Sequence, residues 1–162
     1  MQYIKQFMQR NIMWVTIAVF LVATVVTSFM ILVVYSANIR AEAWAITTEY
    51  DEDSSSPHPL SSFKAIVKVA IYNHGTFSTI LRDASVRVFI NGIDMGTIHF
   101  LNEGHIIPPQ TWCVWDVTFN ATGKTADLLG SNSNYLVYLV AHGVASCMLY
   151  STSFESMHKR TF

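Results

Sequence analysis

Cysteine and histidine are the residues of this chain best suited to redox or metal chemistry. The sequence has two cysteines, Cys113 and Cys147, and six histidines. A copper site for electron transfer combines a Cys thiolate with His and often Met, and its ligands typically lie within a few residues of the Cys. Cys113 is followed by Val-Trp-Asp and Cys147 by Met-Leu-Tyr, so neither has a histidine close downstream. We therefore expect no copper centre and no redox cofactor.

The histidines do not form a zinc signature either. Structural zinc sites use closely spaced pairs of ligands, and no such pair occurs among His58, His74, His99, His105 and His142. Isolated surface histidines fit this pattern. His99 and His105, which flank a short Asn-Glu-Gly segment, are the first candidates for any metal that is bound.

Other motifs of catalysis or nucleic-acid binding are missing from the sequence. No Gly-x-Ser-x-Gly nucleophile elbow occurs, and the seven glycines are spread singly rather than gathered in a phosphate-binding loop. The acidic run 51–53 lacks the spacing and the glycine of a calcium loop, so we interpret it as a solvated loop. Net charge is −1, and no stripe of basic residues would neutralise phosphates. The sequence thus favours a non-enzymatic protein that binds no nucleic acid.

A long apolar segment lies near the N-terminus. Residues Ile12 to Ala37 include no charged residue, no proline and no glycine, and about 20 apolar residues are enough to cross a bilayer as a helix. Secretory signals have apolar regions of only ~7–15 residues, so we expect a retained anchor. The sequence predicts a short N-terminal tail (1–11), a transmembrane helix (12–37) and a folded domain (38–162).

The charges beside the apolar segment predict its orientation. Lys5 and Arg10 precede it without any acidic residue, whereas Arg40 on the other side is followed closely by Glu42. Positively charged flanks remain in the cytoplasm. We therefore expect a single-pass protein of the cell membrane, with a cytoplasmic N-terminus and an extracytoplasmic domain.

Small residues recur along one side of the apolar segment. Ala23 and Thr27, and likewise Thr24 and Ser28, are four residues apart and share a helix face. Such a face permits close packing of another membrane helix. Alternatively, the Thr and Ser hydroxyls bond to their own backbone and the face contacts only lipid. The first alternative predicts other membrane-protein subunits as partners in addition to the bilayer.

After residue 40 the sequence alternates with the period of β-strands. Phe63, Ala65 and Val67 point to one face while Lys64 and Lys68 point to the other. Asn91-Gly92 predicts a type I′ hairpin turn, and His142-Gly143 indicates either a hairpin corner or a bulge in one long strand. We expect an all-β, immunoglobulin-like sandwich of about seven strands. The expected strands are Ala41–Tyr50, Phe63–Tyr72, Ser85–Ile90, Ile93–Leu101, Cys113–Phe119, Tyr135–Ala141 and Val144–Tyr150.

Three segments follow one another within about Phe63 to Tyr150: AIVKVAIYNHG, VRVFINGIDMG and IIPPQTWCVWDVTF. In this order they resemble the late-embryogenesis-abundant family with the WHy (water stress and hypersensitive response) domain. The family's Asn-Pro-Asn is replaced here by Asn73-His74-Gly75. The resemblance implies an immunoglobulin-like sandwich with a non-enzymatic stress or binding role, often behind a single membrane helix.

Two modifications can be considered from the sequence. Asn120-Ala121-Thr122 fits the acceptor for N-linked sugar, and we expect it in an exposed turn after a strand. Cys113 and Cys147 would lie in a compartment where disulfides persist. Both fall within expected strands, and nothing in the sequence fixes them at the same height, so we favour free thiols over a bridge and leave both alternatives open.

The sequence favours a non-catalytic, membrane-anchored β-sandwich that binds or stabilises partners as an accessory subunit of a larger membrane complex. An oxidase or oxygenase assembly is one such complex. The alternative is a structural subunit of a surface filament or surface layer, in which sheet edges pair between copies. A single anchor without a lipid-attachment Cys suits an archaeal cell surface.

Overall fold

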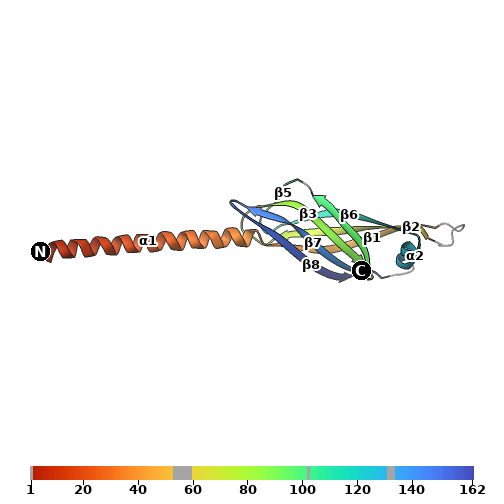
Figure 1. Cartoon of the computed structure of the whole chain (residues 1–162), viewed down its shortest axis with the longest axis horizontal. Coiled ribbons are helices and arrows are strands. Elements are labelled where there is room, and N and C mark those ends of the chain that lie inside the picture. Colours follow the sequence, from red (N-terminus) through yellow and green to blue (C-terminus); the bar gives the residue numbers. More distant parts are fainter. Residues whose placement is uncertain (1, 53–59, 102, 131–133) are drawn as a thin grey trace.

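The computed structural model describes residues 2–52, 60–101, 103–130 and 134–162. One long helix leads into an elongated β domain (Figure 1). In chain order the elements are α1 (Gln2–Ser36), β1 (Ile39–Glu52), β2 (Leu60–Asn73), β3 (Thr79–Ile90), β4 (Ile93–Leu101), β5 (His105–Ile107), β6 (Trp112–Thr122), α2 (Lys124–Gly130), β7 (Leu136–Cys147) and β8 (Tyr150–Thr161).

The strands form two antiparallel sheets. One sheet has the order β1-β2-β6, and the other has the order β4-β3-β7-β8, with β5 paired to β3. This division places the first, second and sixth strands opposite the others, as in immunoglobulin-like sandwiches with an extra strand beside the third. The fold class predicted from the sequence is confirmed, with eight strands in the described chain where about seven were expected.

The core lies where the alternating apolar faces of the two sheets meet. From β2, the side chains of Phe63, Val67 and Ile71 are fully buried, and Val88 of β3 and Leu139 of β7 come from the other sheet. Each such side chain contributes about 1.5–3 kcal/mol by leaving water. The strong alternation along β2 is therefore what fixes the inner face of its sheet.

Two turn predictions had different outcomes. Asn91 and Gly92 both have positive φ, 52° and 82°, as a type I′ turn requires, so that turn is confirmed. At His142-Gly143, however, β7 runs straight through, paired with β8 without a shift. The irregularity lies in β3, where the register shifts between Arg82 and Ser85. Neither a corner nor a bulge in β7 is present.

Gly143 makes this close approach of strands possible. A Cβ at this position would lie 2.7 Å from the ring of Phe154 and 3.3 Å from the Cα of Ala84. The bulged segment of β3 and the Phe154 ring of β8 therefore both occupy the space that a side chain would need.

Side chains of β8 close the sandwich along the β1 edge. The Ala41 amide donates to Ser156 Oγ (2.9 Å), and the Ala43 amide donates to His158 Nδ1 (3.1 Å). Ser156 Oγ also donates to the Ala41 carbonyl (3.2 Å). Exposed strand edges invite pairing with other chains, and here part of the β1 edge is already bonded.

The far end of the core is covered by α2, a short helix that the sequence did not predict. Ala126 and Leu129 of this helix are fully buried, and the helix contacts β2 and β6. Figure 1 places it at the opposite end of the domain from α1. We call the two ends helix-proximal (next to α1) and helix-distal.

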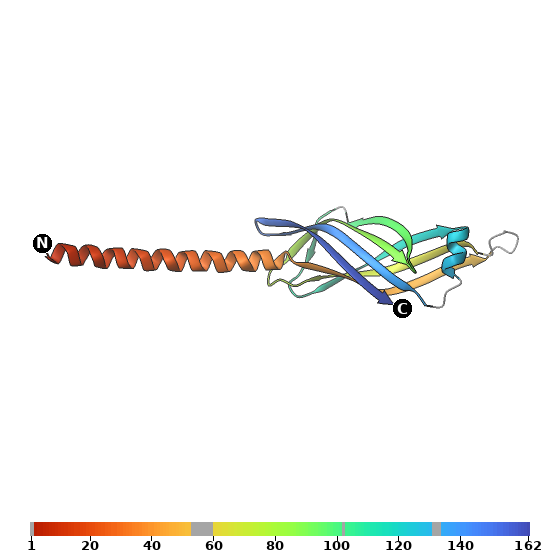
Figure 2. The ribbon, with the colours of Figure 1, turned by 60° about the horizontal axis from the view of Figure 1, so that its bottom comes forward.

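The helix-proximal end is packed directly on α1. Val33 in the last turn of α1 and Ala37 directly after the helix are buried as part of the domain core, and the Phe29 ring lies 6.1 Å from the Phe77 ring in the loop after β2. The turn between β7 and β8 points back along the same helix (Figure 2). Helix and sandwich are therefore joined by packing as well as by the chain.

Candidate binding surfaces next to the apolar helix

Four aromatic side chains gather on the outer face of the β1-β2-β6 sheet. Trp112 lies 5.0 Å from Trp44 and 4.8 Å from Tyr72, and Tyr72 makes an edge contact with His74 at 4.7 Å. Trp44 is 37% exposed, and the other three rings are half-buried. We call these four residues the aromatic patch.

Strand register explains why these rings meet. Tyr72 pairs directly with Trp112, whereas Trp44 lies in a register shift of β1 between Ala43 and Ala45. Ala70 of the central strand is fully buried although its neighbours in sequence place it on the outer face. A methyl group at this position leaves room for the Trp44 and Trp112 rings to meet across β2.

From its middle toward the helix-distal end, the same face carries charged side chains. Lys68 bonds Asp116 and Lys64 bonds Glu49, each at 2.8 Å between directly opposed strand positions. These side chains are about half exposed, 42–58%. The aromatic rings of this sheet face are therefore concentrated beside α1, whereas ion pairs occur along its whole length, from Arg40–Glu42 (2.9 Å) beside α1 to Lys64–Glu49 farther away.

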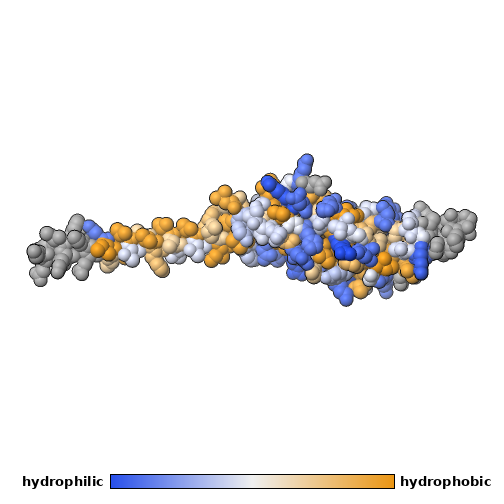
Figure 3. All heavy atoms as spheres, viewed as in Figure 1, coloured by the Kyte–Doolittle hydropathy of each residue, from blue (hydrophilic) through white to orange (hydrophobic). Residues whose placement is uncertain are grey.

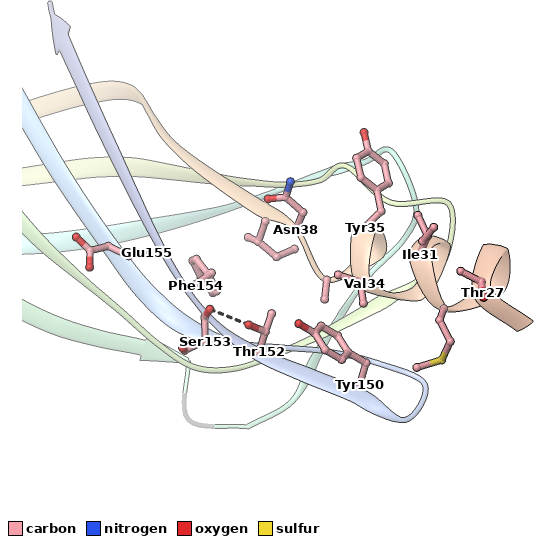
Figure 4. A pocket seen from close by; sticks show the side chains of 13 residues that line it. Thr27, Ile31, Val34, Tyr35, Asn38, Tyr150, Thr152, Ser153, Phe154 and Glu155 are labelled. Carbon is pink, nitrogen blue, oxygen red and sulfur yellow. Dashed lines mark hydrogen bonds between the residues drawn. The ribbon is translucent and has the colours of Figure 1, made fainter.

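A groove of about 770 Å³ separates α1 from the start of β8. Figure 4 shows Thr27, Ile31 and Val34 of the helix on one wall, with Tyr150 across from them and Phe154 nearer the sandwich, beside Ser153. Asn38, Thr152, Ser153 and Glu155 line the end closer to the sandwich. The groove is apolar toward the middle of α1 and has both polar side chains and Phe154 toward the domain.

The turn beside this groove carries exposed apolar side chains. Met148 is 59% exposed and Leu149 is 105% exposed, and Met148 has a positive φ of 53°. We call Met148 and Leu149 the hairpin tip. In Figure 3 orange apolar residues continue from α1 onto the adjoining end of the domain, whereas blue residues are concentrated on the sandwich.

The Asn73 side chain holds the helix-proximal loops together by hydrogen bonds. Its side chain is fully buried, and its amide nitrogen donates to the carbonyls of Phe77 (2.9 Å), Ile107 (3.1 Å) and Pro108 (3.3 Å). Its carbonyl oxygen accepts the Gly75 amide at 2.8 Å. One side chain thus orders the loop that brings Phe77 onto α1.

The predicted helix-packing residues Ala23, Thr24, Thr27 and Ser28 are all exposed on α1. Thr24 donates to the Phe20 carbonyl and Thr27 to the Ala23 carbonyl, both at 2.8 Å. The hydroxyls of both threonines therefore bond their own backbone, as the second sequence alternative holds. Thr27 also lines the groove, which places this helix face next to β8.

The histidine side chains of the described residues do not come together in a metal site. Among the described residues no three His, Cys, Asp or Glu side chains are placed to hold a metal ion. His105 packs against the Trp115 ring at 5.3 Å, and His142 lies 3.8 Å from Glu155. His158, which the sequence reasoning passed over, has the structural role at the β1 edge. His58 lies outside the described residues.

Cys113 on β6 and Cys147 on β7 are not joined by a disulfide. Burial raises the pKa of the Cys113 thiol, and Cys147 is completely buried. A raised pKa keeps the thiol protonated and slows its reaction with alkylating reagents. The helix-proximal surfaces are therefore built around aromatic and apolar contacts rather than reactive sulfur.

The prediction that Asn120 lies in a turn is wrong. The strand β6 continues to Thr122, so the acceptor triplet lies in a strand, with Asn120 opposite Lys64, and not in a turn. The sequence placed the strand end at Phe119 because the apolar alternation weakens there. Asn120 is nevertheless exposed, on the helix-distal half of the sheet face.

Comparisons with known proteins give no family for this chain. No family model matches it, and no curated protein matches it. Among solved structures, a protein from Archaeoglobus fulgidus is 6% identical with a TM-score of 0.38, covering 74% of this chain and 95% of its own. A Northeast Structural Genomics Consortium target is 17% identical with a TM-score of 0.48, covering 78% and 87%. The Bacillus subtilis sporulation control protein Spo0M is 10% identical with a TM-score of 0.37, covering 76% and 48%. At these values the similarities support no inference about this chain.

Proposed function

We propose that this chain is a single-pass membrane protein and a non-catalytic accessory subunit, which uses the aromatic patch to bind a neighbouring membrane-protein subunit beside the bilayer. The anchor is α1, with the N-terminus in the cytoplasm and the sandwich outside. The observation that supports this function best is the position of the patch, on an open sheet face at the end where the domain joins its helix.

The properties of α1 support the anchor. Its segment Asn11–Tyr35 is 25 residues long and apolar enough to cross a membrane. Only 6% of the most apolar 18-residue stretch of this segment is buried in the protein. Val33 and Ala37 at its end belong to the domain core. A leader removed after export would take part of that core with it, which favours retention of the helix.

The chemistry of the patch supports a protein partner. Tryptophan and tyrosine supply most of the energy in many protein interfaces, because large rings bury much area with little loss of conformational freedom. Arg40, opposite Tyr72 in the register, comes only four residues after α1 ends at Ser36. At about 3.3 Å per strand residue, a partner reaching the patch would be close to the membrane surface.

The resemblance to WHy-domain proteins remains part of this proposal, since it implies a binding rather than a catalytic role. The filament alternative needs strand edges that are free to pair with another copy. The bonds from Ser156 and His158 to the β1 edge weigh against pairing there.

Purification in mild detergent tests the proposal. We expect wild-type protein to elute in a defined complex, and the double variant Tyr72→Ala/Trp112→Ala to elute alone. Truncating a buried interface tryptophan often costs about 2 kcal/mol or more, roughly a 30-fold loss of affinity. Thr118→Ala, on the same strand and face but helix-distal, is the matched control.

Two outcomes would overturn the proposed partner. One is an unchanged complex in the double variant, provided that its circular dichroism shows a folded sandwich. The other is long polymers of this chain alone, which would support the filament. The orientation is tested separately, because protease added to intact cells should remove the domain and leave α1 protected.

A further inference from the structure

The hairpin tip has the wrong chemistry for a turn in water. Turns favour Gly, Asn, Asp and Ser, which tolerate positive φ and remain solvated. Met148 instead occupies positive φ, and Leu149 projects completely beyond the protein surface. An exposed apolar pair at a strained turn position indicates that something apolar surrounds it.

The tip lies beside the apolar helix rather than on the remote side of the domain. The groove next to it has a wall made by Thr27, Ile31 and Val34, which belong to the candidate span. The start of β8 therefore overlaps the outer turns of that span along the helix axis (Figure 4).

Helix length places these turns at the edge of the bilayer. The span has 25 residues, which at about 1.5 Å each gives about 37 Å. The hydrocarbon layer is about 30 Å thick, so a total of about 7 Å of the span extends into the polar interfaces at its two ends. The outer turns contacted by the hairpin therefore lie at the boundary between acyl chains and headgroups.

The groove is suited to an amphiphile in this position. Its wall toward the middle of α1 is apolar, and its end near the sandwich offers hydrogen-bonding groups from Asn38, Thr152 and Ser153. An acyl chain would lie along the first part and a headgroup beside the second. A bilayer that surrounds α1 supplies this molecule without any other partner.

We propose that the hairpin tip inserts into the outer leaflet and that the groove behind it binds an outer-leaflet lipid, so that the domain has a second attachment to the membrane. This inference rests on the proposed role of α1 as an anchor. The second attachment restricts how the sandwich tilts on α1 and thereby holds the aromatic patch at a fixed height.

Fluorescence of the full chain in phosphatidylcholine vesicles tests this inference. Single cysteines are introduced by Leu149→Cys at the tip and Thr152→Cys in the groove, in a Cys113→Ala background with Cys147 buried. Each is labelled with an environment-sensitive dye, and nitroxides on lipid acyl chains serve as quenchers. Asn120→Cys, exposed at the helix-distal end, is the matched control.

We expect blue-shifted emission at positions 149 and 152, and quenching several-fold stronger than at position 120. Water-like emission at either 149 or 152 would overturn the inference. Flotation of the same vesicles separates the two proposals: protein that does not float refutes the anchor, whereas protein that floats with a water-exposed tip refutes only the second attachment. Because Leu149 has no packing to lose, its replacement should leave the fold intact.

Discussion

The two halves of the outer face of the β1-β2-β6 sheet use the same strands and different chemistry. Beside α1 the face carries Trp112 in contact with both Trp44 and Tyr72. Farther away it carries the Lys68–Asp116 and Lys64–Glu49 pairs. Exposed ion pairs contribute about 0–1 kcal/mol and mainly keep a surface soluble, whereas stacked rings retain apolar area that a partner can bury. The apolar area that a partner can bury is thus concentrated beside α1, although an ion pair, Arg40–Glu42, lies there as well.

The two ends of the core differ in a similar way. The helix-distal end is covered by the apolar side chains of α2, and the helix-proximal end is fastened by the hydrogen bonds of Asn73. Apolar side chains can cover a core wherever they fill the available volume. A residue that forms several hydrogen bonds, in contrast, fixes the positions of the loops that it bonds. The end that meets the helix is therefore the one with the more specific geometry.

The largest expected effect concerns the apolar end. Leu129→Ala should lower the free energy of unfolding by about 2–4 kcal/mol, because it removes a fully buried side chain and leaves a cavity. Thermal unfolding followed by circular dichroism in detergent micelles measures the loss. Leu128→Ala, on the exposed side of the same helix, is the control. Equal stability of the two variants would show that α2 does not close the core.

Asn73→Ala should cost about 1–3 kcal/mol, since it leaves buried carbonyls and the Gly75 amide without their partner. Unlike the leucine variant, it should also loosen the loop that holds Phe77 against Phe29. Hydrogen exchange of residues 74–78 reports this local opening, and Asn120→Ala serves as the exposed control. Unchanged exchange would mean that the loop is held by other contacts.

Removing one ion pair on the charged half should have a smaller effect. The double variant Lys68→Ala/Asp116→Ala is expected to change stability by less than about 1 kcal/mol and to leave partner binding intact, because the pair is exposed. Its unfolding midpoint and its elution in mild detergent provide both measurements. Loss of the complex would extend the binding surface over the whole sheet face and remove the contrast between its halves.

The elements predicted from sequence are those in which one period repeats over several residues. The apolar segment of α1, the alternation along β2 and the Asn-Gly turn each carry their own signal. In contrast, every residue of β8 is half-buried or exposed, so its pattern has no clear apolar face, and α2 has only seven residues, too few to establish a helical period.

The candidate surfaces needed tertiary information that no local pattern contains. Trp44 lies in a register shift, so counting by twos from Glu42 places it on the face of Trp112, whereas counting back from Glu49 places it on the opposite face. The groove lies between α1 and β8, which are far apart in the sequence. The Ala23–Thr27 face was identified from spacing, but its position beside β8 became visible only in the fold.

The smallest expected effect concerns an ion pair with extra hydrogen bonds at the helix-distal end. Asp94 accepts bonds from Arg87 Nε (3.2 Å to Oδ2) and from the Gly96 amide (2.9 Å), unlike the simpler Lys68–Asp116 pair. The Arg87 hydrogen bond, followed by that from Gly96, lowers the pKa of Asp94 below its ordinary value. A carboxyl whose pKa is lower in the folded state stabilises the fold at pH values above the unfolded pKa of about 3.9, and this contribution is lost as pH falls through the folded value.

Wild-type protein should therefore lose slightly more stability than Asp94→Asn between pH 6 and pH 3, while the two change in parallel from pH 8 to pH 6. Unfolding midpoints of the full chain at these pH values measure the difference, and Asp116→Asn controls for general loss of charge. An identical response of the two asparagine variants would show that the added hydrogen bonds give Asp94 no advantage over an ordinary surface pair. The helix-distal charges would then all serve solubility alone.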